Sequence, residues 1–205
     1  MMRSLTACGV LCGLLLAACS GFKSSEPAVQ SYLLRPALPA RLASAAPASD
    51  ATLTVMLPVA TAGLEGERIA LIQGGQRLDW YRDARWSGEL PLLVQTSIID
   101  ALRAGGRFAA VQSEDAPFGS TYLLEVEIRH FEADYSAGGL PRVRVELTGT
   151  LGKRIDRTVT ASFTAAGQAT ADADRLQSVT GAFQTAFAQA LDQLTNDLQP
   201  PIGST

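Results

Sequence analysis

Hydrophobic and polar residues alternate along much of the chain in the pattern typical of half-buried strands. In the clearest run every second residue from Tyr122 to Ile128 is apolar, and a similar run from Val143 to Leu151 follows the turn residues Gly138-Gly139. A third strand is predicted over about 157–166, so the three runs form an antiparallel meander. Further strands are predicted at 30–35, 53–60, 67–73, 76–82 and 107–112, with a hairpin turn at Gly74-Gly75.

Two segments instead carry apolar residues at the three- and four-residue steps of a helix. The first covers 89–104 and stops at Gly105. The second, 172–199, places apolar side chains from Leu176 to Leu198 on one stripe. Because this stripe is wider than a coiled-coil seam, we expect the helix to pack on the sheet. The pattern predicts one α+β domain, with two main helices packed on a mixed or antiparallel sheet of about seven strands.

The N-terminal segment follows neither pattern. Arg3 gives a short basic start and an apolar run extends from Leu5 to Ala18, which is typical of a signal peptide. The end of the run, Leu16-Ala17-Ala18-Cys19, resembles a bacterial lipobox. We therefore expect cleavage after Ala18, with a diacylglycerol and an N-acyl lipid on Cys19. The alternative is an ordinary small-residue cleavage site followed by an accidental cysteine.

Cysteine usage and charge narrow the class of protein. Cys8 and Cys12 lie in the segment that would be removed, so no disulfide or thiolate metal site is expected in the body. Ser20 favours the outer membrane, with the body in the periplasm, because an aspartate there would resemble an inner-membrane retention signal. The mature chain carries 16 basic and 20 acidic residues. This net negative charge does not suit a nucleic-acid partner.

The chain divides into four predicted segments. These are a signal peptide (1–18), a lipidated N-terminus and tether (19–29), the α+β domain (30–199) and a C-terminal tail (200–205). The stretch from Pro36 to Asp50 is rich in Ala, Pro and Ser and predicts a connector inside the domain. Fully extended, the tether would reach roughly 35 Å.

Candidate catalytic and metal-binding residues are few. His130 is the one histidine, and neither a G-x-S-x-G nucleophile motif nor an evident orienting acid accompanies it. Glu125 and Glu127 invite a glycosidase interpretation, but charge pairing with Arg142 and Arg144 on the next strand explains them more simply. No metal-ligand spacing and no nucleotide-binding glycine motif occurs. The sequence therefore predicts no enzyme, no cofactor and no metal.

The stretch WYRDARW, residues 80–86, holds both tryptophans of the chain. Aromatic and arginine side chains together are typical of protein interfaces, because they bury large areas and still form hydrogen bonds. We therefore take Trp80, Tyr81, Arg85 and Trp86 as candidates for contact with a partner or with another copy. The alternative is that one tryptophan caps the core while arginines and Asp83 form a local ion-pair cluster.

Together these residues resemble the ABC-type transport auxiliary lipoproteins of the PqiC (YmbA) type, which are found with MCE-domain lipid transporters. The resemblance runs over nearly all of the mature chain. The matching features, besides the lipobox, are Tyr32-Leu33-Leu34, LPV at 57–59, RIAL at 68–71, L-x-W-Y-x-x-A-R-W at 78–86, Leu90-Pro91, a helix ending in Gly-Arg-Phe, and the amphipathic C-terminal helix.

The resemblance implies a non-enzymatic subunit, anchored in the outer membrane and facing the periplasm. Its partners would be an MCE-domain periplasmic protein with a separate ABC permease and ATPase, and its copies would form a ring. In this family the WYRDARW segment would shape the core or a neighbour contact. Two alternatives stay open: an envelope-assembly lipoprotein, such as a cell-wall synthase activator or a surface-glycolipid export partner, and a periplasmic hydrolase using His130, Glu125 or Glu127.

Overall fold

The computed structural model describes residues 28–37 and 49–198. The predicted signal peptide, Cys19, most of the tether and connector, and the C-terminal tail lie outside these described residues. The described elements are β1 (Gln30–Tyr32), β2 (Ser49–Val55), β3 (Val59–Ala60), β4 (Arg68–Gln73), β5 (Arg77–Trp86), α2 (Leu90–Gly105), β6 (Phe108–Ser113), β7 (Tyr122–Asp134), β8 (Arg142–Lys153), β9 (Val159–Thr170) and α3 (Leu176–Asp197).

The strands form one nine-stranded mixed sheet organised around β7. One edge of β7 pairs with β8 in antiparallel fashion along its whole length. Its other edge pairs in turn with β2, β3 and β4, all parallel to it. The sheet has more strands than the about seven expected, in part because the run at 53–60 is two strands rather than one. Pro58, which has no N–H to donate to a neighbouring strand, lies where that run breaks.

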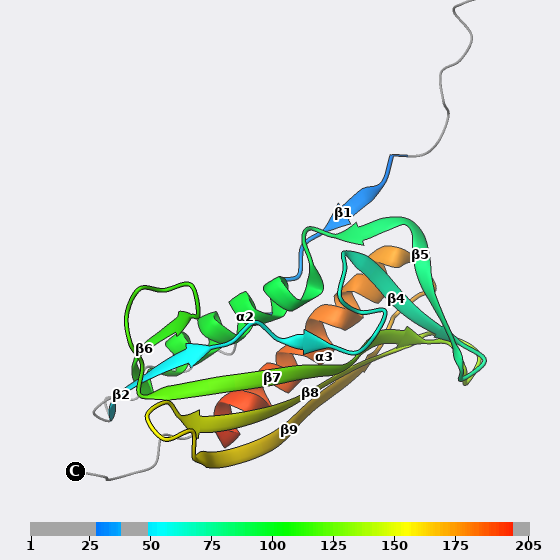
Figure 1. Cartoon of the computed structure of the whole chain (residues 1–205). Helices are drawn as coiled ribbons and strands as arrows, with labels where there is room; N and C mark the ends of the chain where they lie inside the picture. Colours follow the sequence, from blue (N-terminus) through cyan, green and yellow to red (C-terminus); the bar gives the residue numbers. More distant parts are fainter. Residues whose placement is uncertain (1–27, 38–48, 199–205) are drawn as a thin grey trace, which may run out of the picture.

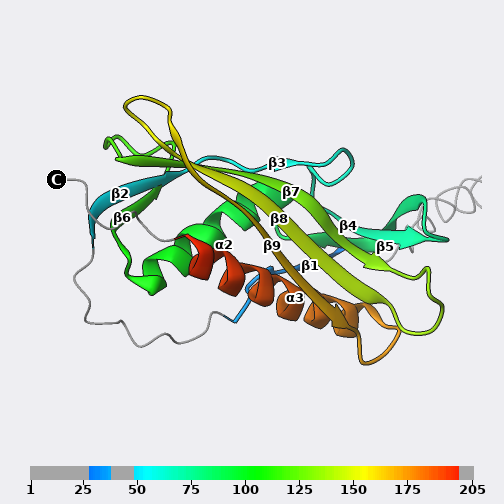
Figure 2. The ribbon, with the colours of Figure 1, turned by 90° about the horizontal axis from the view of Figure 1, so that it is seen from below.

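The two helices cover one face of this sheet (Figures 1 and 2). Helix α3 packs on β8 and β9, and α2 packs on β2, β6 and α3. The close approach of α3 depends on Gly167 of β9, because a Cβ there would lie 1.9 Å from the carbonyl oxygen of Ala186. The predicted α+β domain, the β7–β8–β9 meander and the packing of α3 on the sheet are confirmed. We call the uncovered side of the sheet the open face.

A bulge in β7 changes which residues face the helices. The pairing with β8 shifts between Ile128 and His130, where β7 carries one residue more than its partner. The alternation that buries Ile128 therefore resumes one position late, at Phe131. As a result His130 and Glu132 are directed to the open face, next to Arg144 and Glu146 of β8.

The expected pairing of Glu125 and Glu127 with Arg142 and Arg144 is wrong. In the observed register Glu125 lies opposite Thr150 and Glu127 opposite Thr148, because the β7–β8 hairpin pairs residues from its turn outward. Glu127 instead forms an ion pair with Arg129 of its own strand, at 2.7 Å. The arginines pair in register with the far end of β7, at Asp134 and Glu132.

Candidate functional site

The WYRDARW segment lies in β5, where the strand changes direction (Figure 1). One edge of β5 pairs with β4 before and after the change, and after it the other edge pairs with β1. The β4–β5 register advances from Ala70 to Arg68 on one strand but from Trp80 to Arg85 on the other, so β5 bulges in between. Asp83 in this bulge has a φ of 57°, a backbone conformation that asparagine and aspartate tolerate better than most residues. The segment therefore places its two tryptophans in different environments.

Trp86 is a core residue. Only 1% of its surface is exposed. Its ring packs edge-on against Phe131 of β7, with ring centres 6.0 Å apart, and against Phe183 of α3 at 5.2 Å. Phe131 and Phe183 in turn stack on each other at 5.3 Å. This burial does not fit a direct contact between Trp86 and a partner, and it agrees with the alternative that one tryptophan caps the core.

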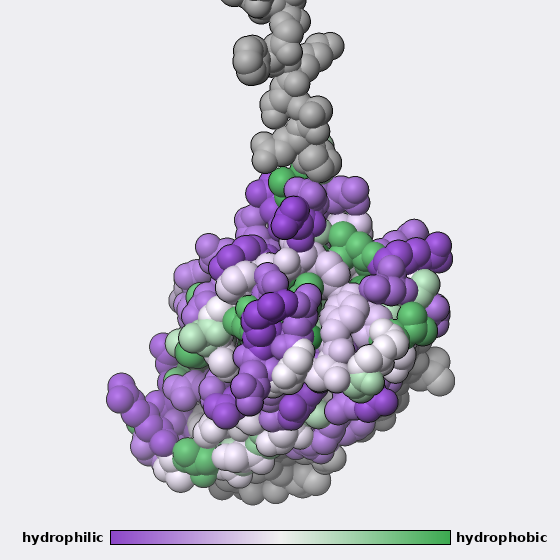
Figure 3. Space-filling model, turned by 90° about the vertical axis from the view of Figure 1, so that its right-hand side faces the viewer, coloured by the Kyte–Doolittle hydropathy of each residue, from purple (hydrophilic) through white to green (hydrophobic). Residues whose placement is uncertain are grey.

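Trp80 faces the open side of the sheet. The Arg68 guanidinium lies 3.5 Å from the centre of its ring, and its indole N–H points to the carbonyl oxygen of Gly63 at 3.4 Å. Across the strands, Trp80 pairs with Ala70, Ala70 with Glu132, and Glu132 with Arg144. Figure 3 views this end of the molecule, whose surface is mostly hydrophilic with scattered hydrophobic residues. An aromatic side chain in a polar surround is the arrangement that interface anchors use.

Tyr81 points to the other side of β5, toward the start of α3. Its hydroxyl is 2.8 Å from the Tyr135 hydroxyl, which donates to a carboxylate oxygen of Asp174 at 2.8 Å. Burial, and then the hydrogen bond with Tyr135, raise the pKa of Tyr81 far above the usual value of a phenol. Burial also raises the pKa of Tyr135. Both side chains therefore stay protonated and connect the β5 hairpin to the segment before α3.

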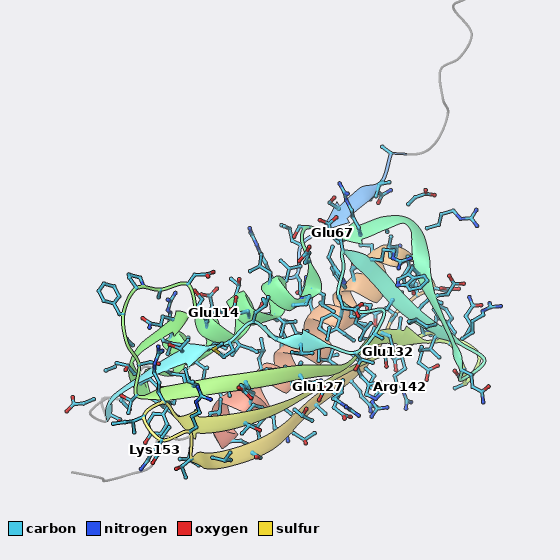
Figure 4. All side chains as sticks on the ribbon, viewed as in Figure 1. Glu67, Glu114, Glu127, Glu132, Arg142 and Lys153 are labelled. Atoms are coloured by element: carbon cyan, nitrogen blue, oxygen red, sulfur yellow. The ribbon has the colours of Figure 1, made fainter. Side chains whose placement is uncertain are left out.

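Arg85 lies at the surface beside β1. Its guanidinium is 3.3 Å from a Glu67 carboxylate oxygen, and its Nε donates to the Ser31 hydroxyl at 3.3 Å. Glu67 lies next to β1 and the end of β5 (Figure 4). The side chains of Arg85 and Glu67 are 51% and 42% exposed. Arg85 is thus accessible to a partner and also bonds to the segment that leads toward the predicted anchor.

That N-terminal segment is fastened to the body at a second place. The side-chain amide of Gln184 on α3 accepts a hydrogen bond from the Arg35 N–H at 2.8 Å and donates one to the Leu33 carbonyl oxygen at 2.7 Å. Leu34 between them is buried in the core. Gln184 could not be predicted from the sequence, because a glutamine on a helix carries no pattern that identifies its distant partner.

His130 and Glu132 form the closest arrangement to a catalytic pair. His130 Nδ1 lies 2.7 Å from one oxygen of Glu132, and the other oxygen accepts the Phe131 N–H at 2.7 Å. Glu132 is 7% exposed, and burial raises its pKa, opposed by His130 and Arg144. This is an orienting acid that the sequence analysis did not find. Among the described residues no serine, threonine or cysteine bonds to His130, so the pair lacks the nucleophile of a triad.

Further candidates in the described part of the chain are limited. Residues 28–37 and 49–198 hold no group of three His, Cys, Asp or Glu side chains placed to bind a metal. Neither α2 nor α3 is long and apolar enough to cross a membrane. On the open face Glu127, Glu132 and Arg142 lie along β7 and β8, with Lys153 toward the far hairpin (Figure 4). The interactions that the open face offers are therefore ion pairs and aromatic contacts.

Solved structures resemble this fold. Protein XCC0632 from Xanthomonas campestris is 26% identical and superposes with a TM-score of 0.71, over 80% of this chain and 93% of that chain. An uncharacterized protein matches at 12% identity with a TM-score of 0.59, over 82% of this chain and 98% of that one, and shows the fold alone. No curated protein matches the chain.

A family model covers nearly the whole folded body. The model of the ABC-type transport auxiliary lipoprotein component matches residues 32–198. This range begins in β1 and ends just after α3, so it includes the bulged β5, the aromatic core and both helices. The match agrees with the resemblance inferred from the sequence. It supports, in general terms, the role of an auxiliary lipoprotein. The chain belongs to the family of ABC-type transport auxiliary lipoprotein components.

Proposed function

We propose that the protein is an outer-membrane-anchored periplasmic subunit that assists an ABC transporter with an MCE-domain partner in lipid trafficking. The observation that carries the proposal is the family match over residues 32–198, in a chain whose residues 16–19 resemble a lipobox. An auxiliary subunit needs an anchor and contact surfaces rather than a reaction centre. The described body offers the Arg85–Glu67 ion pair and the Trp80–Arg68 contact as parts of such a surface.

The anchor is proposed to be the lipid on Cys19, and Ser20 favours the outer membrane. The chain that follows reaches the body through β1, whose pairing with β5 includes Tyr32 opposite Trp86. We expect Cys19→Ser to leave the fold intact and to release the protein from membranes or leave its signal peptide uncleaved. Fractionation of outer and inner membranes, with a mass measurement of the N-terminus, tests this. Unchanged membrane attachment of the variant would contradict lipid anchoring.

Trp80 and Arg85 are the side chains of the WYRDARW segment that we propose for partner contact. Arg85 is exposed and Trp80 is half-buried, and they lie on the two sides of the β5 bulge, so a partner that contacts both would be sensitive to the shape of this strand. Tyr81 and Trp86 are proposed to hold that shape from the core side, through Tyr135 and Phe183. A ring of identical subunits is the assembly we expect, and this surface is a candidate for its subunit contact.

The experiment is affinity purification of the native lipoprotein in mild detergent, with mass spectrometry and a native mass of the assembly. Recovery of an MCE-domain protein with its permease and ATPase supports the proposal. Trp80→Ala with Arg85→Ala should reduce that recovery or lower the native mass. Arg154→Ala, an exposed arginine on the β8–β9 turn, is the matched control. Recovery of a cell-wall synthase or a glycolipid exporter instead would favour an envelope-assembly role.

A further inference from the structure

Strand β9 is an edge strand with an unusual composition. Within residues 28–37 and 49–198 it pairs only with β8, so in this part of the chain its other edge carries backbone groups without a neighbouring strand. Its sequence, VTASFTAAGQAT, has 12 residues and contains no charged residue and no proline. Long, uncharged edges are the segments through which copies of a protein pair and aggregate, and natural proteins usually protect them with lysine, proline or a bulge. The protection of β9 must therefore come largely from elsewhere.

Two glutamines of α3 cover the middle of this edge. Gln193 accepts a hydrogen bond from the Ala166 N–H at 3.0 Å and donates one to the Thr164 carbonyl oxygen at 3.1 Å. Gln189 accepts from the Gln168 N–H at 3.0 Å. The amide of Gln193 thus offers both an acceptor and a donor to β9, as a peptide group of a neighbouring strand would.

The spacing of residues along a helix and along a strand allows successive glutamines of α3 to bond to alternate residues of β9. Residues four apart in a helix advance by about 6 Å along its axis, close to the roughly 6.6 Å between alternate residues of a strand. Gln189 and Gln193 can therefore reach Gln168 and Ala166 from the same side of α3. Gly167 between these two strand residues allows the helix to lie close enough, since a Cβ there would overlap the Ala186 carbonyl.

The beginning of β9 is protected in another way. Its register with β8 shifts between Leu151 and Gly152, where β9 advances from Ala161 to Val159. Thr160 is the additional residue, and its hydroxyl donates to the Leu151 carbonyl oxygen at 3.0 Å. A bulge of this kind bends an edge and makes it a poor template for pairing. The glutamines cover the regular part of the strand, where pairing would otherwise be easiest.

We infer that Gln189 and Gln193 form an edge guard, which prevents β9 from pairing with β9 of a second copy of this chain. The guard acts by occupying the backbone groups of Thr164, Ala166 and Gln168 that a second strand would need. Assembly of the protein is thereby restricted to surfaces other than this edge. The inference is independent of the transporter partner and rests on β9 and α3 alone.

The test is the double variant Gln189→Ala/Gln193→Ala in the full chain, purified in detergent beside the wild type. Its mass is measured by light scattering over a concentration series, and hydrogen exchange is followed over residues 159–170. We expect exchange at Ala166 and Gln168 to rise about tenfold at low protein concentration, for loss of one hydrogen bond each. At high concentration we expect assemblies larger than the wild type, in which these same amides are protected again.

Two further variants separate pairing from loss of folding. Gln177→Ala makes the same change on α3 at an exposed side chain that forms no hydrogen bond with the described residues, and it should behave as the wild type. Adding Ser162→Lys to the double variant should restore the wild-type mass, because a lysine on the edge opposes pairing. If the double variant does not fold, Gln189→Ala alone is judged by the same measurements.

Three results would overturn the inference. One is faster exchange at Ala166 and Gln168 with a mass equal to the wild type at every concentration, which would make the glutamines structural caps only. Another is larger assemblies in which β9 gains no protection, or which persist with Ser162→Lys. The third is unchanged exchange at both amides.

Discussion

The two tryptophans of β5 show how one strand can serve the core and the surface. Trp86 is enclosed by Phe131 and Phe183, and all three rings are buried. Trp80 lies on the open face under the guanidinium of Arg68. The bulge at Asp83 separates the two regions, and beyond it β5 pairs with β1 on one edge while still pairing with β4 on the other. The same residue type is therefore fully buried in the core at one end and half-buried at the surface at the other.

The difference also separates fold from function. Core aromatic residues bury 150–250 Å² each in general, so their loss affects the whole domain. A partly exposed aromatic residue contributes less to stability and more to recognition. Substitutions at five residues, taken from the largest expected effect to the smallest, test this division.

Trp86→Ala should be the most damaging change. Removing a fully buried ring from the cluster with Phe131 and Phe183 leaves a cavity, and we expect a loss of about 3–5 kcal/mol in the free energy of unfolding. Urea unfolding followed by circular dichroism measures it. Trp86→Phe, which keeps a ring, should cost less. A loss below about 1 kcal/mol for the alanine variant would show that Trp86 is not an important part of the core.

Tyr81→Phe should have a moderate effect, because it deletes one hydroxyl of a half-buried chain. The expected cost is about 1.5 kcal/mol, since Tyr135 keeps its bond to Asp174. The same unfolding experiment measures it. Tyr135→Phe removes both bonds and should cost more. If Tyr81→Phe proves the costlier of the two, the connection does not run through Tyr135.

Glu132, in the same row as Trp80, should make stability depend on pH. Because burial raises its pKa, the folded chain holds this proton more tightly than the unfolded chain. The contribution of the carboxyl to stability is therefore fully present at low pH and is lost as pH rises from the ordinary carboxyl pKa through the raised value.

Glu132→Gln cannot titrate at this position, so the stability of the wild type relative to this variant should fall over that pH interval. Unfolding free energies at a series of pH values give the slope. His130→Gln, which removes a neighbour that lowers the pKa of Glu132, should extend the fall to higher pH. A rise of the wild type relative to Glu132→Gln would show that ion pairing outweighs burial.

Trp80→Ala should cost about 1 kcal/mol in stability, because the contact with Arg68 is near the surface. Its main effect should be on association, measured as recovery of partner proteins or as native mass. Arg68→Ala serves as a control that removes the cation but keeps the ring. A loss of stability as large as that of Trp86→Ala would end the distinction between the two tryptophans.

Arg85→Ala should have the smallest effect on folding. Its ion pair with Glu67 is exposed, and such pairs are worth under about 0.5 kcal/mol in many proteins. Comparing unfolding at low and high salt checks this, since screening should abolish what little difference exists. A large effect that persists at high salt would point instead to the Ser31 contact and the β1 pairing.

Much of the fold could be predicted from local patterns. Alternation predicted the strands around Tyr122 and Val143, and the stripe from Leu176 predicted α3. The sequence was less informative where one residue shifts a register. The bulge at His130 moves Phe131 into the core and Glu132 to the open face, and no local propensity predicts that shift. The only sign was the end of strict alternation after Ile128.

The candidate site was predictable only in part. The concentration of Trp, Tyr and Arg in residues 80–86 identified the segment. The division between Trp80 and Trp86 depended on the positive φ at Asp83 and on pairing with β1, which is distant in sequence. The contacts of Gln184, Gln189 and Gln193 could not be predicted from the sequence, because each joins α3 to backbone groups that only the folded arrangement brings near.

Local features of the sequence were enough to predict the class of domain, a leader with a lipidation site, and the resemblance to a family whose model matches residues 32–198. These depend on composition and on short periodic patterns, which are local along the chain. The tertiary structure alone decided the register of β7 and β8, the burial of Trp86 and the cover over the β9 edge. Such features arise from pairing between distant segments, where a shift of one residue reverses the face of every side chain that follows.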